Sequence, residues 1–98
     1  MPRAPDHSAA NFTEAASTLS NNAATIFAAN SKRRGVIIGN PSDTVMTFRI
    51  GGTASATAGC PIGAGTTVTL KGENVPSGLI SLFCAGASKA YCAYEWSE

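Results

Sequence analysis

The sequence predicts an all-β fold: a single antiparallel β-sandwich or small barrel of about eight short strands, preceded by an extended N-terminal arm. Apolar and polar residues alternate over short stretches, which is the period of a half-buried strand. Turn residues, mainly Gly, Pro, Asn and Ser, separate these stretches at steady spacing. The chain has 98 residues, enough for one domain. We therefore expect an arm over residues 1–11 and one β-domain over residues 12–98.

The arm is predicted from its prolines. Pro2 and Pro5 each remove a backbone donor and bias the preceding residue away from helix. If the arm lies on a neighbouring subunit, Phe12 would anchor in a pocket and Arg3 would pair with an acidic surface, so both are candidate partner-binding residues. A terminus that is disordered in the isolated chain fits the same composition.

The first half of the domain is expected to contain four strands. Residues 15–19 and 24–28 are read as two strands around a Ser-Asn-Asn turn, with a helix over part of this alanine-rich segment as the alternative. Residues 34–39 form an apolar strand, and residues 45–50 alternate between apolar and polar. Because Asn, Pro, Ser and Asp fill the link at 40–43, residues 34–50 are predicted to form a hairpin.

The second half is expected to continue with short strands after residues 53–59, which are read as a loop or an edge strand. The predicted strands cover residues 60–62, 66–71, 79–85 and 89–96. In the last of them Trp96 shares a face with Cys92 and Tyr94, and this face is predicted to cover the core. A subunit contact through Trp96 is the alternative.

Composition narrows the class of function. Only 13% of residues are charged, against about 25% in typical domains, so the surface is either partly covered by other molecules or simply rich in small neutral residues. A net charge of +1 argues against a general nucleic-acid binder. The apolar runs are too short to span a membrane, and residues 1–12 do not resemble a signal peptide. We expect folding in the cytosol.

The cysteines are expected to be free and buried. Cys60, Cys84 and Cys92 are odd in number and have no CxxC spacing. A disulfide between Cys84 and Cys92 across a hairpin centred near Ser88 is the alternative. The only histidine, His7, lies in the arm, so neither a metal nor a cofactor is expected.

The most distinctive charges are Lys32, Arg33 and Arg34, which enter a predicted strand together. Arginine forms bidentate bonds to carboxylates and is enriched at interfaces, so the three residues are candidate partner-binding residues. There are two alternatives: the cluster is a solvated strand end that prevents edge pairing, or it is a nucleic-acid-binding patch. The carboxylates are scattered, and the glycines lack the Lys and Ser/Thr of a phosphate loop. We expect no enzymatic activity.

One ordered pattern has a parallel in known proteins. It consists of ANSKRRGVIIGNPSDTVMTFRIGG, PIGAGTTVTL, VPSGLISLFCAG and a final aromatic strand. Over residues 24–96 it resembles small all-β virion structural proteins of tailed bacteriophages. The resemblance implies a capsid decoration (cement) protein that binds between capsid subunits, or alternatively a tail, fibre or head–tail component. It further implies the major capsid protein or other virion proteins as partners, a homo-oligomer such as a trimer, and location in virions assembled in the host cytoplasm.

Overall fold

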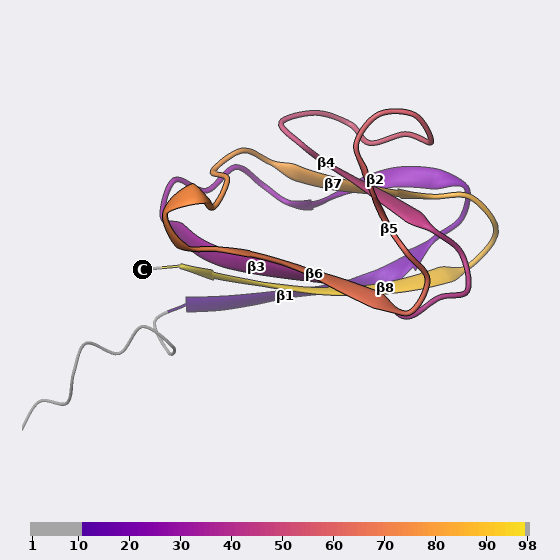
Figure 1. Ribbon diagram of the computed structural model, residues 1–98, viewed down its shortest axis with the longest axis horizontal. Helices are drawn as coiled ribbons and strands as arrows, with labels where there is room; N and C mark the ends of the chain where they lie inside the picture. The colour runs from indigo at the N-terminus through magenta and orange to yellow at the C-terminus, as the bar shows by residue number, and fades with distance from the viewer. Residues whose placement is uncertain (1–10, 98) are drawn as a thin grey trace, which may run out of the picture.

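The computed structural model describes residues 11–97 and shows, over that range, two four-stranded antiparallel sheets packed face to face (Figure 1). We call the sheet with strand order β1-β8-β3-β6 sheet A and the sheet with order β2-β7-β4-β5 sheet B. The predicted β-sandwich is confirmed. The strands and a short 3₁₀ turn are β1 (Asn11–Leu19), β2 (Asn22–Phe27), β3 (Arg33–Asn40), β4 (Met46–Ile50), β5 (Cys60–Ile62), β6 (Thr66–Lys71), η1 (Gly72–Asn74), β7 (Ile80–Cys84) and β8 (Lys89–Ser97).

The alanine-rich segment forms strands and not a helix. β1 starts at residue 11, four residues earlier than the first predicted strand, and pairs with β8 over all nine of its residues. This pairing overrides the helix propensity of Ala15 and Ala16, as tertiary context often does. Within residues 11–97, no helix is long and apolar enough to cross a membrane.

The hairpin predicted for residues 34–50 is wrong, because β3 belongs to sheet A and β4 to sheet B. The link between them crosses the sandwich around the buried side chain of Asn40. Its amide nitrogen donates to the carbonyl oxygens of Thr44 at 2.8 Å and Ile62 at 2.9 Å, and its oxygen accepts from the Ser42 hydroxyl at 2.6 Å. Asn-Pro-Ser-Asp is equally compatible with a hairpin turn and with this arch, so the sequence did not separate them.

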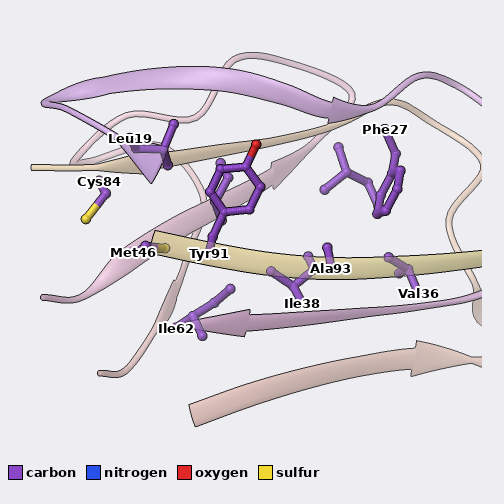
Figure 2. Packing of buried hydrophobic residues seen from close by; sticks show 11 residues of the cluster. Leu19, Phe27, Val36, Ile38, Met46, Ile62, Cys84, Tyr91 and Ala93 are labelled. Carbon is purple, nitrogen blue, oxygen red and sulfur yellow. The ribbon is translucent and has the colours of Figure 1, made fainter. Parts of the chain in front are cut away.

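The core lies between the sheets and is drawn from both of them (Figure 2). β8 contributes the side chains of Tyr91 and Ala93, which are buried. The prediction that the opposite face of this strand, with Trp96, covers the core is therefore wrong. The buried cluster consists of Leu19, Phe27, Val36, Ile38, Met46, Ile62, Ile80, Leu82, Cys84, Tyr91 and Ala93.

Candidate partner-binding surface

Trp96 lies on the outer face of sheet A. Successive residues of a strand point to opposite faces, so Trp96 projects away from the side that holds Tyr91 and Ala93. The register places it between Phe12 of β1 and Gly35 of β3. A Cβ atom at Gly35 would overlap the six-membered ring of the indole. The indole therefore lies across the backbone of β3, where glycine alone leaves room for it.

The rings of Phe12 and Trp96 stack against each other at one end of sheet A. Their centroids are 6.2 Å apart and their planes differ by 23°. Phe12 is 56% exposed, the largest exposure among the large apolar side chains in the part of the chain that the structure describes. We call these two residues the aromatic surface. Phe12 is exposed and Trp96 is half-buried, and aromatic residues of this kind are enriched at protein interfaces.

The next residues along the same face form a polar pair. Tyr94 lies opposite Glu14 across β1 and β8 and is 44% exposed. The negative charge of Glu14 raises the pKa of the Tyr94 hydroxyl above its ordinary value, and a hydrogen bond between the two side chains adds to the effect. This pair orients the phenol beside the aromatic surface.

The three residues of the basic cluster have different environments. Lys32 and Arg34 are exposed at the end of sheet A where β3 begins, whereas Arg33 is 4% exposed. Lys71, at the end of β6, is the cross-strand partner of Gly35 and is also exposed. Lys32, Arg34 and Lys71 thus lie at the end of the sheet that holds the aromatic surface.

The side chain of Arg33, which was predicted to bind a partner, is buried inside the protein. Its Nε donates to Glu95 Oε2 at 2.7 Å, and its two terminal nitrogens donate to the carbonyl oxygens of Pro76, Gly78 and Ala28. The guanidinium therefore joins two loops to β8 inside the protein. The sequence held one signal for this role: Glu95 shares a face with Tyr91 and Ala93, and a carboxylate on a core-facing side needs a buried cation.

A shallow groove beside the cluster has a volume of about 420 Å³ and is lined by Arg33, Arg34, Gly72 and Glu73. Glu73 adds one exposed negative charge to this end of sheet A. The groove is too open to enclose a small ligand, but it makes the surface next to Arg34 concave. Arg3, the remaining candidate, lies outside the described residues.

The cysteines are free, as expected, but only one of them is buried. Cys84 lies in the core, and removal from water raises the pKa of its thiol. Cys60 and Cys92 are exposed, which corrects the prediction that all three are buried. The alternative disulfide is also wrong, because Cys84 lies in sheet B and Cys92 on the outer face of sheet A. Across residues 11–97, no group of three metal-ligating side chains comes together.

Comparison with known proteins gives little further guidance. No protein-family model matches the chain, and no curated protein matches its sequence. A solved structure of similar shape comes from Bacillus endospore appendages, reported as a family of disulfide-linked pili. It is 15% identical, the match covers 89% of this chain and 85% of that chain, and the TM-score is 0.49. Similarity at this level gives no functional assignment.

Proposed function

We propose that the protein is a structural protein of a tailed-bacteriophage virion and that it decorates the capsid. The observation that supports this most directly is the aromatic surface of Phe12 and Trp96 beside the exposed cations Lys32, Arg34 and Lys71. Aromatic residues and arginine are enriched where proteins bind each other. The resemblance of residues 24–96 to virion proteins suggests which assembly this surface joins, a phage particle.

The surface suits a shell protein with an apolar patch and acidic groups around it. Covering Phe12 and Trp96 removes aromatic area from water, which supplies most of the affinity. Arg34 and Lys32 at the margin favour carboxylates on the partner, which sets orientation and association rate more than affinity. The expected contact is about 800 Å² on each partner, the usual scale for a specific interface.

Stabilisation of the shell would follow from mass action. A protein that binds assembled subunits and not separated ones stabilises the assembly by RT ln(1 + [L]/Kd), which is about 2.7 kcal/mol per site when the free concentration is 100 times Kd. Repetition over many sites on one particle makes a modest contact sufficient. No chemical step is needed, and we propose that the protein is not an enzyme.

Co-sedimentation with capsids of the encoding phage tests this function. The wild type is expected to pellet with capsids and to saturate at many copies per particle. Phe12→Ser should weaken binding by about thirtyfold, since an interface hot spot is worth roughly 2 kcal/mol. Val45→Ser is the matched control, because Val45 is exposed to a similar degree, 53%, next to β4 of sheet B. Wild-type protein that remains in the supernatant would refute decoration.

A further inference from the structure

Strand β1 is an unpaired edge of sheet A (Figure 1, indigo). Among residues 11–97, no strand pairs with its outer side, and its nine residues pair with β8 without a bulge. In an antiparallel ladder, alternate residues direct their N–H and C=O groups away from the neighbour. From Phe12 to Leu19, β1 therefore presents a continuous row of backbone donors and acceptors for another strand.

The other edges in the described part of the chain have features that hinder strand addition. β5 is three residues long and contains Pro61. β2 has a register shift between Thr25 and Phe27. β6 ends in a lysine, Lys71. Short edges, proline, irregular register and lysine are the means by which natural proteins prevent edge pairing. β1 contains none of these, although it ties with β8 as the longest strand.

We propose that β1 pairs with β1 of a second copy of this chain, antiparallel and across a twofold axis. The two copies of sheet A then form one continuous sheet. Such a contact is isologous, so each residue of one copy meets its counterpart in a reciprocal register. The pairing is longest when the axis lies at Ala15, the middle residue of β1, which places Phe12 opposite the partner subunit's Thr18.

The side chains are compatible with this register. Glu14 lies opposite the partner subunit's Ala16, and Phe12 lies opposite the partner subunit's Thr18. No like charges lie directly opposite each other, whereas an axis at residue 14 would place two glutamates together at a cost. Glu14 also interacts with Tyr94 of β8 in its own copy.

This pairing is separate from the proposed docking surface. It uses the backbone edge of β1, whereas the proposed docking uses the side chains of Phe12, Trp96 and Arg34 on the outer face and at the end of the sheet. Capsid binding can therefore fail while the dimer persists, and the dimer can fail while capsid binding persists. The experiment accordingly contains the full-length protein and no capsids.

Sedimentation velocity over a range of concentrations, with Ala16→Lys and Ala16→Glu, tests the pairing. Ala16 is exposed on the outer face, so the isolated subunit accommodates either side chain. In the dimer, lysine at 16 faces Glu14 twice, and glutamate at 16 repels it twice. We expect Ala16→Lys to dimerise more tightly than wild type and Ala16→Glu more weakly, with dissociation constants that differ by about tenfold or more. Ala56→Lys and Ala56→Glu, in an exposed loop, should leave the dimer unchanged.

Hydrogen exchange on the wild type gives a second readout that needs no variant. The amides of residues 11–19 should exchange more slowly as protein concentration rises, while those of the β5 edge should not change. A monomer at all concentrations, a trimer, an open-ended polymer, or equal effects of the two Ala16 variants would each overturn the twofold β1 pairing.

Discussion

Strand β8 has an ion pair near each end, and the two pairs have the same nitrogen–oxygen distance in different environments. Arg33 to Glu95 and Lys89 to Asp43 both measure 2.7 Å between nitrogen and oxygen. The side chains of Arg33 and Glu95 are 0% and 9% exposed, whereas those of Lys89 and Asp43 are 24% and 81% exposed. An equal distance therefore does not mean an equal contribution to stability, because water weakens the second pair and leaves the first almost unscreened.

The two pairs also differ in what else they hold. Arg33 donates to three backbone carbonyl oxygens besides Glu95, so its loss would leave a buried carboxylate and three partly buried acceptors without their donor. Lys89 joins β8 to Asp43 in the exposed link between β3 and β4. The first pair is a structural requirement of the fold, and the second is a surface contact.

The largest expected effect is that of Arg33→Ala. Removing one partner of a buried pair costs about 3–5 kcal/mol, a large fraction of the roughly 5–15 kcal/mol that stabilises a domain. Urea unfolding should show this loss or a failure to fold. The control is Lys32→Ala at the adjacent, exposed position, which should change the free energy of unfolding by about 0.5 kcal/mol or less. Similar losses for both variants would contradict the assignment.

Gly35→Ala should have the next largest effect, and it sharpens the contrast between the two faces of β8. The added methyl group overlaps the indole of Trp96, so the ring must move and stability should fall by about 1–3 kcal/mol. Trp96 fluorescence and thermal unfolding measure both consequences. Gly63→Ala is the control, because a Cβ there meets the Thr66 side chain only at ordinary contact distance, 3.6 Å. An unchanged emission spectrum in Gly35→Ala would show that the indole does not lie over β3.

The Glu14–Tyr94 pair tests how an exposed charge acts on the outer face of β8. The pKa of Tyr94 is raised, mainly by the charge of Glu14. The raised pKa means that the folded state favours the neutral phenol. The contribution of Tyr94 to folding stability is therefore present below the ordinary tyrosine pKa of about 10 and is lost as pH rises through the folded-state pKa. Glu14→Gln should lower the pKa of Tyr94 in an NMR titration. A titration that Glu14→Gln leaves unchanged would contradict the contact.

Asp43→Asn should have the smallest effect. A hydrogen bond from Lys89 is the main cause that lowers the pKa of Asp43, followed by one from Thr44. The stability that the Asp43 carboxylate provides is therefore present above the ordinary aspartate pKa of about 3.9 and lost as pH falls through the lower folded-state pKa. Melting temperatures of wild type and variant should differ slightly near neutral pH, converge in acid, and converge in about 1 M salt. A loss comparable to that of Arg33→Ala would remove the distinction between the two pairs.

The sequence predicted the strands better than the way they connect. Alternation and turn residues located all eight, because these patterns depend on local geometry. They did not separate a hairpin from an arch between sheets, so the pairing of residues 34–39 with 45–50 was wrong. What decides it is the buried amide of Asn40, whose partners at Ile62 and Gly63 are distant in sequence.

The candidate site was predicted in part for the same reason. Phe12, Lys32 and Arg34 were singled out, and the fold places them at one end of sheet A. Trp96 was predicted to cover the core because its face also carries Cys92 and Tyr94, but alternation does not say which face of a strand is buried. Arg33 was grouped with Lys32 and Arg34 because the three charges are adjacent in sequence. That adjacency does not show that one of them is buried against Glu95.

If the protein decorates a phage capsid as proposed, co-sedimentation of Arg34→Glu and Arg49→Glu with those capsids tests most directly whether this end of sheet A docks on a partner. Both are exposed arginines, one at the start of β3 and the other on β4 of sheet B, and both variants change the net charge equally. We predict that Arg49→Glu binds like wild type, whereas Arg34→Glu binds about tenfold more weakly. Equal binding of the two variants would contradict docking through the surface beside Phe12 and Trp96.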